Sequence, residues 1–193
     1  MLKPYFDSKL IEAGVDEVGR GCLAGPVVAA AVILPKKFNH QLLNDSKKMK
    51  ESDRLSCELY IKENAISWAI AEVSPLEIDQ INILQASFRA MHLALDQLII
   101  SPEHILVDGN RFNPYRFIAH TCIIKGDSKM MSIAAASVLA KCYRDRLMTD
   151  LGQEYPHYLW HKNVGYPTIA HRKAIAQFGT TPYHRMSFRL LKQ

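Results

Sequence analysis

The 193-residue chain predicts a mixed α/β fold with early antiparallel strands, followed by helices and further strands. Three observations support this: two strand-like apolar segments before residue 35, a capped helical segment after residue 74, and two short apolar strands that each run into an aspartate. With 48% hydrophobic and 22% charged residues, the composition is that of a globular protein, and we expect a single domain over residues 1–193.

The first part of the chain supplies strands and one helix. Three segments predict strands by their apolar and β-branched content: residues 11–18, 27–34 and 65–73. A helix is expected between the last two strands, over residues 52–62, with Leu55, Leu59 and Tyr60 on one face.

A second helix begins at a capping box, in which Ser74 and Glu77 enclose Pro75. Apolar residues then recur at helical spacing, which predicts one helix to about residue 100. Short strands are expected at residues 104–107 and 117–124.

The last part of the chain is expected to be helical. Residues 131–148 predict a helix in which the small residues at 134–137 allow close packing. Thr168 is a suitable cap for a final helix that ends near Gly179. We therefore expect a small helical C-terminal extension over about residues 150–193.

Several classes of protein are disfavoured by the sequence. No apolar run reaches the roughly 18–20 residues that a membrane-spanning helix needs, and residues 1–10 lack the apolar core of a signal peptide. Four cysteines without a C-x-x-C pair indicate neither a zinc site nor a disulfide framework. We expect reduced thiols, a cytoplasmic location and no membrane partner.

Charge is distributed unevenly along the chain. Residues 1–110 hold 11 Lys and Arg against 15 Asp and Glu, whereas residues 111–193 hold 13 against 4. This asymmetry suggests that the C-terminal part binds a polyanion. The alternative is a solvated basic face, which charge alone does not distinguish from a binding surface.

The most informative stretch is AGVDEVGRGCLAGP, residues 13–26, where Asp16 and Glu17 precede a Gly-Arg-Gly turn. Its glycines fit the dinucleotide pattern G-x-G-x-x-[GA], but Gly25-Pro26 and a buried strand follow where a Rossmann turn opens a helix. A tight hairpin is the structural alternative. Neighbouring residues of a strand point to opposite faces, so a bend or bulge near Gly19 is required if both acids serve one site.

Further acidic and basic side chains follow predicted strands. Asp108 and Asp127 each follow an apolar strand, although each could also be a turn-forming aspartate beside glycine. Four carboxylates with cations nearby at Lys47, Lys125 and Lys129 would form a two-metal site for in-line attack on a phosphodiester.

Two other segments are ambiguous. Residues 44–48, NDSKK, form either a solvated turn or a phosphate grip that uses Ser46 and the following lysines. His157 and His161 have a metal-like spacing, but the central glutamate of H-E-x-x-H is absent, which favours stacking or surface roles.

In this order, the motifs closely resemble those of ribonuclease HII over almost the whole chain. They are GVDEVGRG with LAGPVVAAAVIL, NDSKK, LVDG, KGDSK with SIAAASVLAK, RDR, GYPT and HRMSF. The resemblance implies an RNase H-like fold and cleavage of the RNA strand in RNA/DNA hybrids, including single ribonucleotides in duplex DNA, as in ribonucleotide excision repair. It implies two-metal hydrolysis with Mg2+ or Mn2+ that leaves 5'-phosphate and 3'-hydroxyl ends.

Site roles are implied by the same resemblance. The metal ligands and catalytic residues would be Asp16, Glu17, Asp108 and Asp127, so that both acids of the first strand are used. Gly19, Arg20 and Gly21 would read the ribose 2'-hydroxyl, the group that distinguishes RNA from DNA, while Tyr166 packs on the next deoxyribose. Residues that would position phosphates are Ser46, Lys47, Lys125, Lys129 and Arg185, with His171 and His184 as further candidates.

The chain differs from the family pattern at Cys22, where many members carry proline, which affects the stiffness of the turn. No C-terminal peptide for a sliding clamp is seen, and a monomer is expected. Two alternatives remain: a nuclease of the same fold that cuts all-DNA junctions, and a non-catalytic RNA/DNA-binding protein. Carboxylates clustered where a polyanion binds argue against the second, because without cations they repel phosphate.

Overall fold

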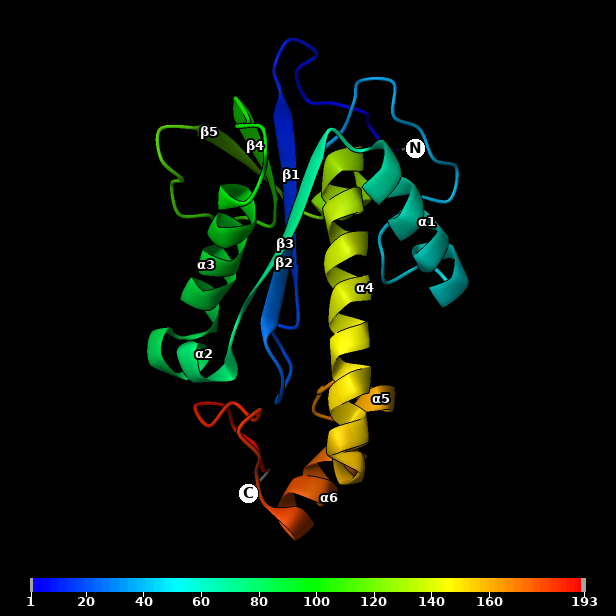
Figure 1. The fold of residues 1–193 in the computed structure, drawn as a ribbon. Coiled ribbons are helices and arrows are strands. Elements are labelled where there is room, and N and C mark those ends of the chain that lie inside the picture. The colour runs from blue at the N-terminus through cyan, green and yellow to red at the C-terminus, as the bar shows by residue number, and fades with distance from the viewer. Residues whose placement is uncertain (1, 192–193) are drawn as a thin grey trace.

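A five-stranded sheet forms the centre of the protein in a computed structural model that describes residues 2–191 (Figure 1). The strand order is β3-β2-β1-β4-β5. The strands are β1 (Glu12–Val18), β2 (Val27–Ile33), β3 (Ser67–Val73), β4 (His104–Asp108) and β5 (Ala119–Ile123). The predicted strands are confirmed, with ends that shift by one or two residues.

The direction of the strands places the acidic residues on one edge of the sheet. β1 pairs antiparallel with β2 and β2 with β3, whereas β1 pairs parallel with β4 and β4 with β5. The carboxyl ends of β1, β4 and β5 therefore lie at the same edge. Asp16, Glu17 and Asp108 come from this edge.

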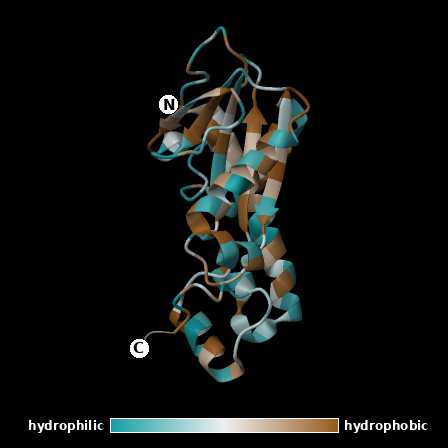
Figure 2. Ribbon diagram, turned by 90° about the vertical axis from the view of Figure 1, so that its left-hand side faces the viewer, coloured by the Kyte–Doolittle hydropathy of each residue, from teal (hydrophilic) through white to brown (hydrophobic). Residues whose placement is uncertain are grey.

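Helices cover both faces of the sheet. α3 (Ile83–Asp96) packs on one face and the 24-residue α4 (Met131–Glu154) on the other, with α1 (Glu51–Asn64) beside α4 (Figure 1). β2 is buried at every position, and the apolar strands lie between the helical layers (Figure 2). The two cores are built from alternate residues of the same strands, as the period of two requires.

α4 approaches β1 closely because small residues meet there. A Cβ atom on Gly14 would lie 2.2 Å from the backbone carbon of Ser132 and 2.4 Å from the nitrogen of Ile133. Ala134, Ala135 and Ala136 are fully buried in the same layer. The predicted close packing of this segment is confirmed, and it holds α4 directly against the strand that carries Asp16.

The C-terminal segment extends from the lower end of α4 (Figure 1). It contains a short turn η2 (Pro156–Tyr158), α5 (Trp160–Asn163) and α6 (Ile169–Phe178), and the Thr168 hydroxyl caps α6 by accepting from the His171 amide at 3.1 Å. Side chains from this segment form a third apolar cluster with Leu23 and Ala24. The extension therefore packs against the loop that contains the Gly-Arg-Gly turn.

Three predictions about helices are corrected by the structure. The helix expected from Ser74 to about residue 100 is broken at Asn82, whose φ of 66° ends α2 (Pro75–Ile81) and whose side chain caps α3. In α1, Leu55 and Leu59 are exposed, because Cys57, Glu58 and Ile61 face α4 instead. α4 continues six residues beyond the predicted end.

Within residues 2–191, no helix combines the length and apolar character that a membrane crossing requires.

Candidate active site

Asp16 and Glu17 lie on opposite faces of β1. The pairing of β1 with β2 is unbroken from Ala13 to Val18, so no bulge turns the two side chains to one face. Asp16 is 4% exposed on the α4 face, and Glu17 is on the α3 face. The expected bend does occur at Gly19, whose φ is 94°, but it follows both acids. The two carboxylates therefore bracket the sheet edge.

Asp108 ends the neighbouring strand β4 and lies near both acids. Its Oδ1 accepts a hydrogen bond from the Gly126 amide at 2.7 Å, which fixes the carboxylate against the turn after β5. Burial, then the negative charges of Glu17 and Asp108, raise the pKa of Asp16 well above its usual range. Burial raises the pKa of Glu17, against the effect of Arg20 and with a further contribution from Asp108. Asp108 therefore interacts with both acids.

Asp127 adds a fourth carboxylate from the short turn η1 (Gly126–Ser128) after β5. Burial, with Asp108 and Asp45 nearby, raises its pKa, while Lys47 opposes the shift. Although burial acts to lower the pKa of Lys47, Asp16, Asp127 and the other acids raise it. Lys47 therefore places a positive charge next to the acidic residues on the α4 side of the sheet.

The donor set fits a divalent cation by its chemistry. Carboxylate oxygens suit Mg2+ and Mn2+. Within residues 2–191, however, no three His, Cys, Asp or Glu side chains converge on one point as ready-made ligands. The acids are placed along an edge, on both faces of the sheet.

Two fully buried arginines donate hydrogen bonds to backbone carbonyls of the loop after β1. Arg144 of α4 donates from Nε to the Pro26 carbonyl at 3.0 Å, from Nη2 to Ala24 at 3.0 Å and from Nη1 to Val164 at 2.8 Å. Arg185 donates from Nε and Nη2 to the Gly25 carbonyl at 3.0 and 2.8 Å and from Nη1 to Arg20 at 3.0 Å. Neither pairs with an acidic side chain within residues 2–191.

This arrangement changes the interpretation of Arg185. A phosphate contact was predicted for it, but its side chain is 0% exposed and its hydrogen bonds all go to backbone carbonyls. Burial lowers its pKa to about 10, which leaves it charged at neutral pH. The placement therefore does not support a direct contact, and Arg185 orients the loop instead.

The Gly-Arg-Gly turn itself rests on Arg144. A Cβ on Gly19 would lie 2.3 Å from Arg144 Nε, so only glycine allows this approach, whereas Gly21 is exposed with open space around it. The Arg20 side chain points back to Glu17, with Nη1 3.1 Å from Oε1. The turn therefore presents backbone at Gly21 and a guanidinium beside the carboxylate of Glu17.

Tyr166 is 38% exposed and its backbone is anchored by a buried histidine pair. His171 Nδ1 donates to the Tyr166 carbonyl at 2.9 Å, and its Nε2 accepts from Trp160 Nε1 at 3.0 Å and faces His184 Nε2 at 3.2 Å. The amide of Thr181 donates to His184 Nδ1 at 2.9 Å. These partners fix both imidazoles as neutral tautomers.

The histidine pair is therefore not available to phosphates. His171 and His184 are 0% and 2% exposed, which does not support their predicted phosphate contacts. Of the two surface histidines, His157 stacks on Phe178 with ring centroids 4.3 Å apart, as the stacking interpretation predicts.

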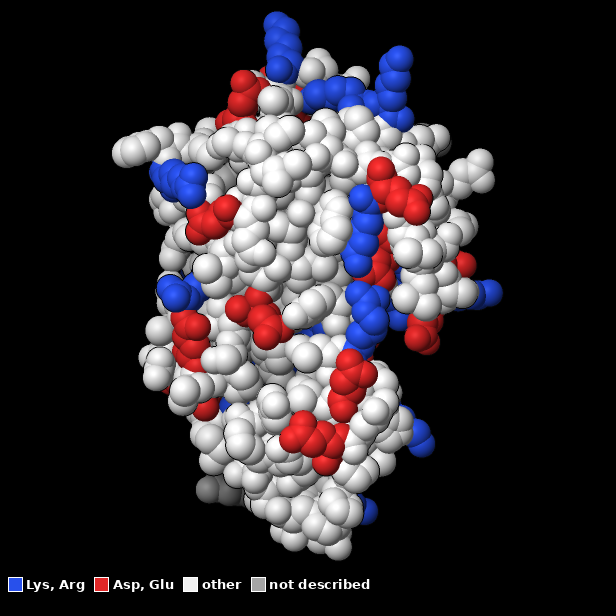
Figure 3. All heavy atoms as spheres, viewed as in Figure 1, with Lys and Arg blue, Asp and Glu red and all other residues white. Residues whose placement is uncertain are grey.

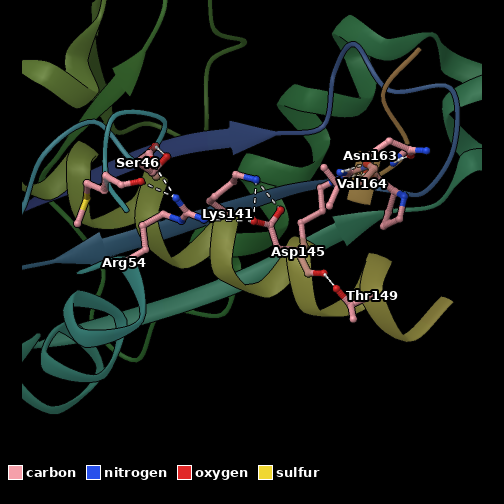
Figure 4. Close-up of polar contacts among 12 residues, drawn as sticks. Ser46, Arg54, Lys141, Asp145, Thr149, Asn163 and Val164 are labelled. Atoms are coloured by element: carbon pink, nitrogen blue, oxygen red, sulfur yellow. Dashed lines mark hydrogen bonds and ion pairs between the residues drawn. The ribbon is translucent and has the colours of Figure 1, made fainter. Parts of the chain in front are cut away.

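Ser46 is also turned inward. Its hydroxyl lies 2.8 Å from that of Ser137 in α4, so it supports the loop rather than facing solvent. Arg54 of α1 donates to the carbonyl of Ser46 at 3.4 Å, and Lys141 faces Asp145 at 2.6 Å on the adjoining part of α4 (Figure 4). Lys47, Lys125 and Lys129 are exposed, as a phosphate-contacting role requires.

The basic surplus of the C-terminal part is therefore only partly a surface property. Arg144 and Arg185 are buried, and Lys141 and Arg146 pair with Asp145 and Glu58. Acidic and basic side chains alternate where α1 and α4 meet (Figure 3). The net charge of the segment overstates the positive charge available to a polyanion.

Comparison with known proteins gives the family. A profile described as Ribonuclease HII matches residues 13–191. A ribonuclease HII from Bacteroides thetaiotaomicron is 62% identical over 191 residues, which covers 99% of this chain and 96% of the relative. The chain belongs to the ribonuclease HII family. It is accordingly a ribonuclease H, a hydrolase that acts as an endoribonuclease on RNA/DNA hybrids.

Solved structures agree with the RNase H-like fold. The crystal structure of ribonuclease H2 from Pyrococcus horikoshii matches with a TM-score of 0.77 at 27% identity, covering 93% of this chain and 94% of that one. Bst-RNase HIII in complex with Mn2+ matches with a TM-score of 0.66 at 18% identity, covering 93% and 67%, and shows likeness of fold alone. The predicted fold class and family are confirmed.

Sequence reasoning missed the supporting residues of this ribonuclease H. Arg144 and Ser137 were not identified as site candidates, although both lie in motifs of the family. Arg144 donates only to backbone carbonyls, and Ser137 bonds the Ser46 hydroxyl and Asp16 from inside α4, and such contacts leave no pattern in the sequence. Arg144 stands in RDR and Ser137 in SIAAASVLAK. The one indication in the sequence was that these polar residues lie in a helix expected to be buried, where polar side chains need hydrogen-bond partners.

Proposed function

We propose that this ribonuclease H cleaves the RNA strand of hybrids and also cuts on the 5' side of a single ribonucleotide in duplex DNA. The observation that carries the proposal is the continuity of two features: the acidic sheet edge at Asp16, Glu17 and Asp108 runs directly into a glycine turn held open for backbone contact. A 2'-hydroxyl at that turn would lie beside the cleavage site.

The chain's own residues divide the work. Asp16, Glu17, Asp108 and Asp127 would hold divalent cations, Mg2+ or Mn2+ and two in number. When bound, the ions would supply Lewis acidity to activate water and to stabilise the leaving 3'-oxygen. Lys47 places a phosphate on the α4 side of the edge, and Lys125 and Lys129 extend this positive surface without reading bases. The products would carry 5'-phosphate and 3'-hydroxyl ends.

Recognition of the junction falls to the turn and to Tyr166. Gly19, Arg20 and Gly21 form the turn. Arg185 binds the Arg20 carbonyl, and Arg144 and Arg185 bind the carbonyls of Ala24, Gly25 and Pro26 that follow, which keeps the backbone in one conformation for the 2'-hydroxyl. Tyr166 packs on the following deoxyribose. Through Tyr166, the C-terminal segment contributes to substrate binding.

Cleavage of a labelled DNA duplex with one central ribonucleotide tests this function. The reaction contains Mg2+ or Mn2+, and an all-DNA duplex and Asp108→Asn serve as controls. A cut 5' of the ribonucleotide, absent from both controls, is expected. Cleavage of a long hybrid alone would refute the junction specificity, and cleavage of all-DNA substrates would favour a junction nuclease.

A further inference from the structure

A groove opens on the α3 face of the sheet, on the side opposite Lys47. Glu17 and Arg20 line it from β1 and the turn, Asp108, Asn110 and Arg111 from the end of β4, and Phe88 from α3. Its volume is about 310 Å3. This is room for about one nucleotide unit and not for a duplex.

One of the two arginines that line the groove has no acidic partner among the described residues. Arg20 is paired with Glu17 at 3.1 Å, but Arg111 is exposed and forms no ion pair within residues 2–191. By contrast, Arg116 in the same connection between β4 and β5 pairs with Asp96 at 2.6 Å. Arg111 is thus the guanidinium of this connection that stays available to an anion.

Arg111 is also held in place. Gly109, with φ of 108°, turns the chain after Asp108. The next anchor is Phe112, which is 9% exposed and packs edge to face on Phe88 of α3, with ring centroids 6.2 Å apart. A short segment fixed at both ends carries Asn110 and Arg111 at the rim of the groove, three residues or fewer from a predicted catalytic carboxylate.

We propose that this groove is a subsite for the sugar-phosphate backbone of the cleaved strand, and that Arg111 contacts the phosphate next to the scissile one. The inference rests on the proposed function. Lys47 would then hold phosphate on one face of the sheet edge and Arg111 on the other, so that the strand crosses the edge between Asp16 and Glu17. A planar guanidinium suits a phosphate because it donates two parallel hydrogen bonds.

The test compares Arg111→Ala with Arg116→Ala, which removes the same charge from the same connection outside the groove. Affinity for a fluorescent RNA/DNA hybrid is measured by anisotropy in EDTA at several salt concentrations, so that cleavage does not enter. Arg111→Ala is expected to weaken binding about five- to tenfold and to reduce the salt slope by roughly one. Arg116→Ala should stay within about twofold of wild type.

Two further measurements separate a contact from a structural effect. Arg111→Lys should recover part of the affinity and most of the salt slope, because it keeps the charge but not the fork. In steady-state cleavage of the hybrid, Arg111→Ala should raise KM more than it lowers kcat. Equal affinities for Arg111→Ala and Arg116→Ala would overturn the subsite. If wild type cuts hybrids but not single ribonucleotides, the junction specificity fails while this binding result still decides the subsite.

Discussion

Removal of the Arg20 side chain should increase the affinity of the free enzyme for Mn2+. In the structure, Nη1 of Arg20 lies 3.1 Å from Oε1 of Glu17, so a metal ion that binds the Glu17 carboxylate must first displace the guanidinium. The Arg20 side chain is 51% exposed and that of Glu17 is 11% exposed, and a pair of this kind is worth about 0.5–1 kcal/mol. Arg20→Ala should therefore tighten Mn2+ binding roughly two- to fivefold.

Isothermal titration of the enzyme with Mn2+, without nucleic acid, measures this effect. Arg111→Ala is the matched control, because it removes one positive charge from the same groove and breaks no ion pair. A smaller gain is expected for it, from the change in long-range potential alone. Unchanged or weaker binding in Arg20→Ala, or an equal gain in both variants, would show that Arg20 does not compete for Glu17.

Three other predictions test packing, acid stability and junction reading. Gly14→Ala places a methyl group against the α4 backbone and should cost about 3 kcal/mol, seen as a fall in Tm of roughly 10 °C, whereas Gly21→Ala should leave Tm nearly unchanged; equal Tm values would contradict the close approach. Burial and then His171 lower the pKa of His184 to about 4 from about 6.5 in the unfolded chain, so its stabilisation is complete above pH 6.5 and lost as pH falls. Urea unfolding at pH 7.5 and 5 should differ by about 2 kcal/mol more in wild type than in His184→Gln, and parallel curves would refute this. Tyr166→Ala should reduce discrimination for the ribonucleotide junction more than Mn2+ affinity, and an equal loss of both would exclude a junction-reading role.

The acidic edge illustrates how far one sequence pattern extends. Asp16 and Glu17 could be identified as candidates because carboxylates inside an apolar strand require partners. The period of two also predicted that they point apart, and the regular pairing of β1 bears this out. Only the fold shows that Asp108 lies near both acids, because the parallel pairing of β1 with β4 places the carboxyl ends of these two strands side by side.

Local periodicity, turn chemistry and ordered motifs were enough to predict the strands, the capped start of α2, the small-residue surface of α4 and the family. The partners of long polar side chains, by contrast, depend on the tertiary structure. Arg185 and His184 resemble exposed binding residues in the sequence, yet both are buried because carbonyls and imidazoles far along the chain satisfy their hydrogen bonds. Such long-range satisfaction depends on where distant backbone groups point, which no local pattern records.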